Sequence, residues 1–498
     1  MARMILVGFI IIIYLALSAW VIRRHHKKQL VFQGTERADV LLAFASQTGH
    51  AEQLAVLTSE MLLVAGLPVQ VKSLSAVTTE MLSSFRRVLF VVSTTGEGDA
   101  PENAVDFMRA EMHGTRRLDA LEYGLLALGD RRYSNFCGFG HLLDTWLQQS
   151  HALPLFDMVE VDDGDAGALR HWQSQLGLLT GSTATTDWNT PIYQSWRLKD
   201  RQLLNPGSAG EAVYHLKLEA LESSESWQAG DIAEIGPRNS SEAITRLLSV
   251  LGLQAEVVAN EYGATLSQCL ADRSLPFSFA DMDALRGLSP KALVAVLKPL
   301  SHREYSIASL PHEGLELVVR QFRHENGQLG HGSGWLTEYA KIGDEVALRV
   351  RRNIAFHAPA NATPLILIGS GVGIAGLHAH LKASIGAGQH RHWLFFGERN
   401  KAHDNYFGNE LKGWHQQGVL TRLDIAWSRD QDKPIYVQDM IRNAVKELRI
   451  WLHDGATILV CGSANRMAPA VHHALVEIVG DKAMATLAAS GRYRRDVY

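Results

Sequence analysis

The chain has 498 residues, of which 46% are hydrophobic and 20% charged, and its formal net charge is -4. This length exceeds what one hydrophobic core supports, so we expect roughly two to four domains. The slightly acidic balance argues against a nucleic-acid-binding protein, which usually presents a basic surface. Cys137, Cys269 and Cys461 lie far apart in the sequence and favour reduced thiols over a disulfide framework.

An uncharged apolar run of 19 residues extends from Met4 to Ile22 and is followed by RRHHKK. As a helix it is roughly 28 Å long, enough to cross a bilayer. The alternative is a signal peptide cut near Ala19, but its positive charge belongs before the apolar run, where only Arg3 stands. The positive-inside rule therefore predicts that residues 1–35 are a single-pass anchor in the inner (cytoplasmic) membrane, with the catalytic domains in the cytoplasm.

Residues 36–180 repeat a scheme of buried strand, loop and helix, which predicts a doubly wound parallel sheet. The loops SQTGHAE, STTGEGD and LGDRRYSNF follow three of these strands, where such sheets bind ligands. Taken alone, the first loop fits either an anion site at a helix N-terminus or a simple helix cap. Acidic side chains outnumber basic ones by 19 to 10 in this segment, which fits either a basic electron acceptor or an ordinary solvated surface.

The three loops resemble, in order and spacing, the FMN domain of the diflavin reductase family, which includes NADPH–cytochrome P-450 reductase and the sulfite reductase flavoprotein. The resemblance implies a flavodoxin-like fold and an FMN site at three places. The FMN phosphate would be held by Ser46, Gln47, Thr48, Gly49, His50 and Ala51. The isoalloxazine would be lined by Thr94, Thr95, Gly96, Glu97, Gly129, Tyr133, Asn135 and Phe136, with Asp163 at its edge. Thr95 stands where the cytochrome reductases have an aromatic residue, so we expect a stacked ring on one side only.

Residues 181–198 are small and polar at their start and are predicted to be a linker. Residues 199–360 alternate strand patterns with a helical stretch at about 241–298. They resemble the family's FAD-binding antiparallel β-barrel with a shortened helical insert. The motif REYS and the later loop GHGSG imply FAD contacts at Arg303, Tyr305, Ser306, Gly330, Gly332 and Ser333. A fixed guanidinium suits a diphosphate, and the loop glycines leave backbone amides accessible to it.

Residues 361–498 resemble the family's α/β NADPH-binding domain, which completes a module like ferredoxin-NADP reductase. A strand, a glycine-rich turn and a helix begin it, although the turn is not the GxGxxG fingerprint. The resemblance implies that NADPH contacts Gly371, Gly373, Ser428, Arg429, Lys433, Tyr436, Gln438 and Cys461. Two departures bear on nucleotide binding: Pro434 stands where the family has a lysine, and Ser463 where it commonly has an aspartate.

The resemblance also places Ser306, Cys461, Asp496 and Tyr498 on the hydride path, with the Tyr498 ring over the FAD until nicotinamide displaces it. We therefore expect an NADPH-dependent diflavin oxidoreductase that passes electrons from NADPH to FAD to FMN. The acceptor is expected to take single electrons, as does a haem protein such as the sulfite reductase haemoprotein or a cytochrome. The alternatives are a ferric or siderophore reductase at the inner membrane and a flavin-binding docking module without catalysis. No metal-ligand pattern stands out.

Overall fold

The computed structural model describes residues 38–112, 117–181, 188, 192–222, 226–359, 363–464 and 466–498. The chain divides into two compact units, Met1–Asp165 and Ala166–Tyr498. Among the described residues, every helix is too short or too polar to span a bilayer. The anchor predicted over residues 1–35 lies outside this part of the chain.

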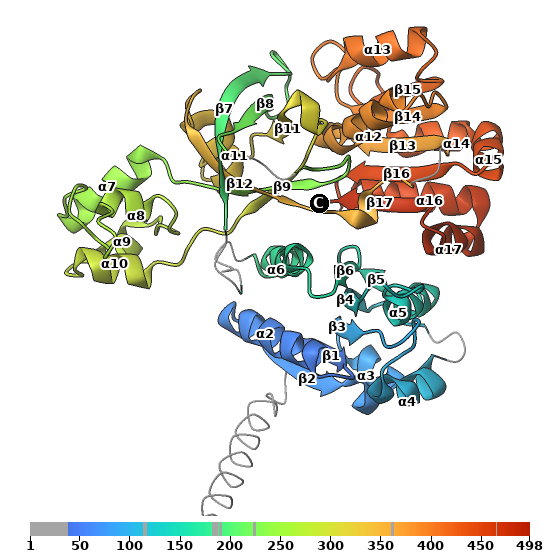
Figure 1. Cartoon of the computed structure of the whole chain (residues 1–498), viewed down its shortest axis with the longest axis horizontal. Coiled ribbons are helices and arrows are strands. Elements are labelled where there is room, and N and C mark those ends of the chain that lie inside the picture. Colours follow the sequence, from blue (N-terminus) through green and yellow to red (C-terminus); the bar gives the residue numbers. More distant parts are fainter. Residues whose placement is uncertain are drawn as a thin grey trace, which may run out of the picture. The chain divides into compact units, whose positions relative to one another are not determined.

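The first unit is a parallel sheet with strand order β2-β1-β3-β4-β5, and β6 also pairs with β4 (Figure 1). This order is that of the flavodoxin-like doubly wound fold, which confirms the expected class for this segment. Its strands are β1 (Val40–Ala45), β2 (Val69–Ser73), β3 (Arg87–Ser93), β4 (Glu122–Gly129), β5 (Leu153–Pro154) and β6 (Val159–Asp162). Its helices are α2 (His50–Val64), η1 (Leu74–Ala76), α3 (Thr79–Ser84), α4 (Glu102–Glu111) and α5 (Gly138–Gln149).

Strand β1 is buried along its whole length, as expected for a parallel strand covered on both faces. In β1 and β3, Ala45 pairs with Val92, so both strands end at the same edge of the sheet. The register of β3 with β4 brings Ser93 opposite Leu128. The three glycine-bearing loops that follow β1, β3 and β4 therefore emerge side by side.

The second unit begins with α6 (Ala166–Thr180), a helix that the sequence pattern assigned to the flavodoxin-like segment. An antiparallel sheet follows in the order β10-β9-β12-β7-β8-β11. Its strands are β7 (Gln194–Leu203), β8 (Val213–Ala220), β9 (Ile232–Gly236), β10 (Arg303–Ser306), β11 (Leu315–Arg320) and β12 (Glu345–Arg351). The short helical turns of this part are η2 (Pro311–Glu313), α11 (His331–Gly334), η3 (Trp335–Tyr339) and η4 (Ile354–Phe356).

A small helical subdomain interrupts the antiparallel sheet between β9 and β10, where the sequence predicted a helical insert. Its helices are α7 (Ser241–Leu251), α8 (Leu266–Leu270), α9 (Phe279–Asp283) and α10 (Pro290–Val296). Each begins after a Ser or Thr whose side chain accepts a hydrogen bond from the first turn. The subdomain has its own core, which includes Leu247, Leu266 and Leu293.

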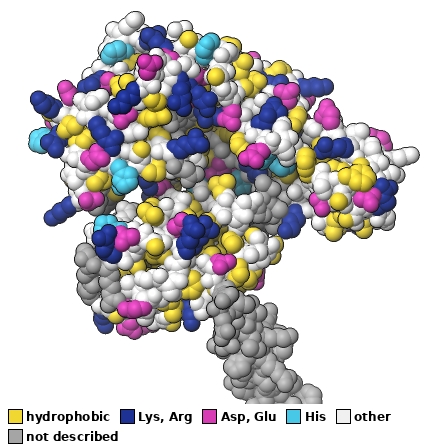
Figure 2. All heavy atoms as spheres, turned by 180° about the vertical axis from the view of Figure 1, so that it is seen from behind, with side chains coloured by type: hydrophobic (Ala, Val, Ile, Leu, Met, Phe, Trp, Pro, Cys, Tyr) yellow, Lys and Arg dark blue, Asp and Glu magenta, His cyan; other side chains and the backbone are white. Residues whose placement is uncertain are grey.

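The C-terminal part is a parallel sheet with strand order β15-β14-β13-β16-β17. Its strands are β13 (Leu365–Ser370), β14 (His392–Glu398), β15 (Arg422–Trp427), β16 (Thr457–Gly462) and β17 (Tyr493–Val497). Its helices are η5 (Gly371–Gly373), α12 (Ile374–Gly386), α13 (Gly408–Gln416), α14 (Val437–Asn443), α15 (Val445–His453), α16 (Met467–Val479) and α17 (Asp481–Ala489). Acidic and basic side chains are interspersed over the face seen in Figure 2, in keeping with the small net charge.

Candidate functional site

The first predicted FMN loop is tied to the start of α2. The Ser46 hydroxyl accepts hydrogen bonds from the backbone N–H groups of Gly49 at 3.0 Å and Ala51 at 3.2 Å. Ser46 thus caps the helix, so it contributes to an anion site by shaping the loop. Thr48 and His50 remain exposed. They can donate hydrogen bonds to a phosphate at this helix N-terminus.

The second and third loops contact each other directly. The Glu97 carboxylate accepts a hydrogen bond from the backbone N–H of Ser134 at 3.0 Å. A Cβ on Gly98 would lie 2.6 Å from Cβ of Asn135, so only glycine permits this approach. Next to the third loop, the N–H of Asp163 donates to the carbonyl oxygen of Gly129 at 2.9 Å.

Two features of these loops fit FMN. The Thr94 hydroxyl is buried and has no hydrogen-bond partner among the described residues, although a buried polar atom is normally paired. Tyr133 is 47% exposed, as expected for a side chain that is available for stacking. Thr95 and Gly96 lie in the same loop, and Phe136 stacks beneath the Arg131 guanidinium at 4.0 Å. The predicted residues are therefore brought together, and they offer an unpaired polar group beside an open ring.

The two predicted FAD motifs also meet. A Cβ on Gly332 would lie 2.5 Å from Cγ of Arg303 and 2.7 Å from Oη of Tyr305, so the GHGSG loop packs directly against β10. Loss of solvent lowers the pKa of Arg303. Its Nη1 donates only to the carbonyl oxygens of Ser301 at 3.0 Å and His302 at 2.8 Å. Among the described residues no carboxylate acts on Arg303, so a bound diphosphate would supply the missing negative charge.

Residues from three distant strands converge at the predicted hydride site. The Ser306 hydroxyl on β10 donates to Oδ2 of Asp496 on β17 at 2.7 Å. Sγ of Cys461 on β16 lies 3.6 Å from the same oxygen and 3.9 Å from the Ser306 hydroxyl. Cys461 and Asp496 are register partners in the parallel sheet. The three side chains expected to act together thus form one cluster.

Burial sets the ionisation of this cluster. Loss of solvent raises the pKa of Asp496, even though the Ser306 hydrogen bond and the charge of Arg351 favour its carboxylate form. Burial, and then the negative charge of Asp496, raises the pKa of the Cys461 thiol well above its usual range. Asn353 donates to the other oxygen of Asp496 at 3.5 Å. The cluster therefore favours a neutral thiol and holds the carboxyl group in a fixed orientation.

Tyr498 lies immediately beyond this cluster. Its backbone N–H donates to the carbonyl oxygen of Gly462 at 3.1 Å, and its own carbonyl accepts from Ala464 at 2.9 Å. Its phenol neighbours Cys461 and Asp496, and loss of solvent there raises its pKa, yet 49% of the residue remains exposed. The main chain is thus fixed and the phenol group is buried, while about half of the residue's surface remains accessible.

The predicted nucleotide loop packs closely against the predicted hydride site. Gly371 has φ 59°, a left-handed conformation that favours glycine. A Cβ on Gly373 would lie 2.2 Å from the carbonyl oxygen of Cys461, which leaves no room for any side chain. The predicted 2′-phosphate residues Ser428, Arg429, Lys433, Tyr436 and Gln438 lie between the end of β15 and the first turn of α14, with Arg429 and Lys433 exposed.

The structure adds residues that the sequence analysis missed. Arg320, at the end of β11, contacts Glu398 at 3.1 Å, and its Nη2 would lie 2.6 Å from a Cβ on Gly371. This places a cation beside the nucleotide loop. Asn353 is the second such residue, because its hydrogen bond to Asp496 depends on the packing of the loop after β12 against β17. No local pattern identifies either residue.

A buried ionic network lies next to the hydride site. Glu234 is fully buried and contacts three guanidinium groups, those of Arg170 at 2.9 Å, Arg351 at 3.5 Å and Arg349. Glu304 accepts from His171 at 2.7 Å and Arg351 at 3.1 Å. Glu234, His302 and Glu304 are close enough to share a cation. The arginines already supply the positive charge there, so this group forms an ion-pair network.

Comparisons with known proteins agree with this geometry. A family model described as Flavodoxin matches residues 42–172. The sulfite reductase [NADPH] flavoprotein alpha-component of Klebsiella pneumoniae is 30% identical over 92% of this chain and 90% of the relative. The corresponding protein of Vibrio cholerae is 30% identical over 92% of the chain and 87% of the relative. That of Neisseria meningitidis is 28% identical over 94% and 91%.

The chain belongs to the diflavin reductase family. This confirms the family, the class of NADPH-dependent oxidoreductase and the cofactors FMN, FAD and NADPH that were expected from the sequence. The individual site residues and the domain boundaries stay predictions. The hydrogen bonds and close contacts of the predicted residues support these predictions.

Proposed function

We propose that this diflavin reductase takes electrons from NADPH and delivers them singly to a haem protein, as the name of its relatives suggests for them. Bound NADPH supplies two electrons as a hydride, and the two flavins divide them into single electrons. The observation that carries the proposal is the convergence of Ser306, Cys461 and Asp496 on one point. These residues come from the FAD-binding sheet and from the nucleotide-binding sheet, so the cluster lies where the two cofactors have to meet.

Each residue of the cluster has a distinct role in this proposal. The Ser306 hydroxyl is oriented by Asp496, so that its oxygen is presented in one direction. Cys461 is a neutral, buried thiol that shapes the nicotinamide position and keeps water away. The Asp496 carboxylate would stabilise the positive charge that a bound nicotinamide gains on giving up its hydride.

We also propose which kind of protein accepts the electrons. A haemoprotein partner fits the excess of acidic over basic side chains in residues 36–180, because complementary charge accelerates association. We also propose that the apolar run Met4–Ile22 anchors the chain in the inner membrane. The basic stretch Arg23–Lys28 would then hold the enzyme on the cytoplasmic side.

The proposal is tested on the purified full-length chain. Extracted flavins are quantified, and NADPH oxidation is followed with sulfite reductase haemoprotein, cytochrome c and a ferric chelate as separate acceptors. We expect one FMN and one FAD per chain and the fastest turnover with a haem protein. Faster reduction of the ferric chelate would assign the chain to iron reduction instead. Absence of NADPH oxidation with every acceptor would leave only a flavin-binding docking module.

Membrane attachment needs a separate experiment. Membranes from the native source are washed at high pH, and the full chain is compared with a variant that lacks residues 1–35. The proposal expects the full chain to stay in the membrane pellet and the truncated chain to be released. Release of both, or retention of both, contradicts an anchor in this segment.

A further inference from the structure

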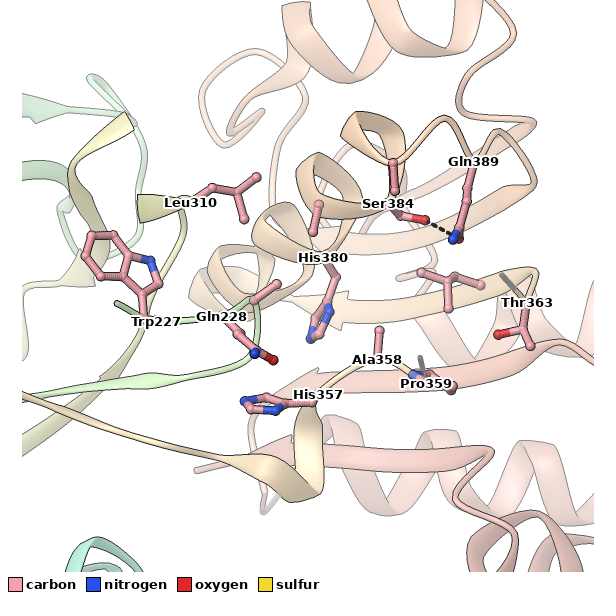
Figure 3. Close-up of a pocket in the computed structure, with 14 residues that line it drawn as sticks. Trp227, Gln228, Leu310, His357, Ala358, Pro359, Thr363, His380, Ser384 and Gln389 are labelled. Carbon is pink, nitrogen blue, oxygen red and sulfur yellow. Dashed lines mark hydrogen bonds between the residues drawn. The ribbon is translucent and has the colours of Figure 1, made fainter. Parts of the chain in front are cut away.

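A cavity of about 350 Å³ lies apart from the residues assigned to FMN, FAD and NADPH. It is bordered by the loop after β8 at Trp227–Ala229, by the segment after η4 at His357–Pro359, and by α12 (Figure 3). The floor includes the buried residues Trp227, Leu365 and Ser384, whereas Gln228, Ala358 and Ala387 are exposed at the rim. Its volume is in the range of small-molecule sites.

The described residues that line this cavity are polar but uncharged, or apolar. Its polar side chains belong to Gln228, His357, Thr363, His380, Ser384 and Gln389, and the remaining lining residues are apolar. Among the described residues of the lining there is no lysine, arginine, aspartate or glutamate. The three cofactor sites, in contrast, are built to receive phosphate. An anionic ligand would lose its hydration here without gaining a counter-charge, so the cavity favours a neutral ligand.

His380 distinguishes this cavity from an ordinary surface hollow. The residue is 1% exposed, and among the described residues neither ring nitrogen makes a well-aligned hydrogen bond, although the backbone of Phe356 lies close enough to favour the protonated ring slightly. Its ring is directed from α12 toward Gln228 and His357 (Figure 3). Burial lowers the pKa of His380 to about 3, so the imidazole is neutral and offers one donor and one acceptor. A buried polar group without a hydrogen-bond partner destabilises the protein, unless a ligand or a water molecule forms the missing hydrogen bond.

The other polar groups of the lining are largely engaged. The Ser384 hydroxyl donates to the Gln389 side chain at 2.8 Å, and Nε1 of Trp227 donates to the carbonyl oxygen of Ser309 at 3.0 Å. Nε2 of His357 contacts Asp231 at 2.5 Å. His380 has no side-chain partner among the described residues and at most a weak contact with the backbone of Phe356, so at least one of its ring nitrogens is left for a ligand. An amide or hydroxyl group suits it, since each can both donate and accept.

The cavity is connected to the hydride site by two short routes. The Phe356 ring stands edge-on to His380, with 5.1 Å between centroids. A Cβ on Gly376 would be 3.4 Å from both Phe356 and Sγ of Cys461, so Phe356 and Cys461 approach the same point of α12.

The second route consists of hydrogen bonds. Asp231, which holds His357, also accepts from the backbone N–H of Asn353 at 2.8 Å, and the Asn353 side chain donates to Asp496. Arg494, two residues before Asp496, donates to the carbonyl oxygen of His357 at 2.6 Å. A ligand that moves His357 therefore also moves groups that hold Asp496.

We infer that this cavity binds a small uncharged aromatic molecule bearing an amide or hydroxyl group, held by His380, and that its occupancy alters the rate of flavin reduction by NADPH. The apolar lining residues Leu310, Pro359 and Ala383 contact the ring. The coupling rests on the proposed function, whereas the binding does not. Binding and rate are therefore measured separately.

Benzamide is the probe, and benzoate is its charged counterpart of nearly the same shape. Binding to the flavin-loaded full chain is measured by calorimetry and ligand-observed NMR with NADP⁺ present at saturation, which excludes binding at the nicotinamide position. We expect saturable benzamide binding and at least tenfold weaker binding of benzoate, about the effect of one uncompensated charge. Equal binding of the two probes, or no saturable binding of benzamide, would overturn the proposed site.

Three variants locate the binding. His380→Phe keeps a ring of similar size but removes both nitrogens, and we expect about fivefold weaker benzamide binding for the loss of one hydrogen bond. Ala383→Phe fills the cavity and should abolish binding. Ala488→Phe, at an exposed position on α17, is the matched control and should bind as the parent does. Unchanged binding in Ala383→Phe overturns the site, as does unchanged binding in His380→Phe.

The coupling is read from stopped-flow flavin reduction. Benzamide should change the rate constant by twofold or more in the parent and in Ala488→Phe, but leave it unchanged in Ala383→Phe. An identical rate with and without bound benzamide overturns the coupling and leaves the binding site standing. Failure of NADPH to reduce the flavin at all would contradict the proposed function, and the calorimetric result would still decide the site.

Discussion

The Ser306 hydroxyl donates a hydrogen bond to Asp496 at 2.7 Å, although 190 positions separate the two residues in the sequence. This contact joins the end of an antiparallel strand to the last strand of a parallel sheet. It fixes the geometry at which the antiparallel sheet and the C-terminal parallel sheet meet, and it helps to set the ionisation of Asp496.

Replacing Asp496 by Asn should make stability less sensitive to pH. Because the folded protein raises the pKa of this carboxyl, the group stabilises the fold below its ordinary pKa, about 4, and loses that contribution as pH rises through the raised value. We expect D496N to be more stable than the parent at pH 7 and to lose this advantage as the pH falls toward about 4. Thermal unfolding at a series of pH values measures this, with the exposed Asp432→Asn as control. Parallel pH profiles for parent and variant would contradict it.

The three thiols should differ sharply in reactivity. Burial raises the pKa of Cys137 and Cys461, and both are fully buried, whereas Cys269 is partly accessible. Since the thiolate is the reactive form, iodoacetamide should modify Cys269 at least about 100-fold faster in the native protein. Mass spectrometry of timed samples measures the rates, and the urea-unfolded chain, in which all three should react alike, is the control. Early labelling of Cys461 would argue against a closed hydride site.

Tyr498→Ala should weaken the preference for NADPH over NADH. In the proposed arrangement the nicotinamide has to displace the Tyr498 ring, which costs free energy. NADPH can offset this cost with the contacts of its 2′-phosphate, whereas NADH lacks that group. Removing a stacked ring lowers that cost, so the ratio of kcat/KM values should fall by about tenfold. Tyr262→Ala, at an 86% exposed tyrosine in the helical subdomain, is the control. An unchanged ratio would show that the Tyr498 ring does not cover the position that the nicotinamide has to enter.

Arg303→Gln should release FAD and retain FMN. The guanidinium is largely buried and lacks a carboxylate partner among the described residues, so its charge is available for the diphosphate. Losing a charge-assisted contact should weaken FAD binding by about 10- to 100-fold. Chromatography of the extracted flavins after desalting gives the FAD-to-FMN ratio. Arg323→Gln, at an exposed position between β11 and α11, should keep a ratio near that of the parent.

Arg349→Met should strongly destabilise the second unit. Its guanidinium pairs with the fully buried Glu234, and removing one partner of a buried pair leaves an uncompensated charge. We expect a loss of about 3–5 kcal/mol, seen as a shift of the urea transition. Arg442→Met breaks a surface pair with Glu477 and should change little. If the transition shifts no more than in Arg442→Met, Arg170 and Arg351 are sufficient to neutralise Glu234 without Arg349.

The sequence predicts the parts of this enzyme that depend on local patterns. Apolar runs identify the parallel strands, and glycine or hydroxyl residues just after them mark the cofactor loops, because strand ends in a parallel sheet share one edge. The meeting of Ser306 with Cys461 and Asp496 followed from family resemblance rather than from any local pattern. The roles of Asn353 and Arg320 did not follow at all, since they depend on contacts between segments distant in the chain.

The first FMN loop shows a subtler limit. The sequence allowed Ser46 to be either a phosphate ligand or a helix cap. The structure directs its hydroxyl to the N–H groups of Gly49 and Ala51. Composition alone does not distinguish these roles, because the same hydroxyl serves both equally well.

Glu234 and Glu304 stand directly opposite each other on β9 and β10. Like charges at such positions repel, so this pair of strands does not gain stability by pairing alone. The arginines that neutralise it arrive on β12, more than 40 residues later in the chain, and on α6, well before it. During synthesis, the sheet therefore gains its full stability only after the polypeptide has been completed through Arg351. We infer that this part of the enzyme folds in one late, cooperative step.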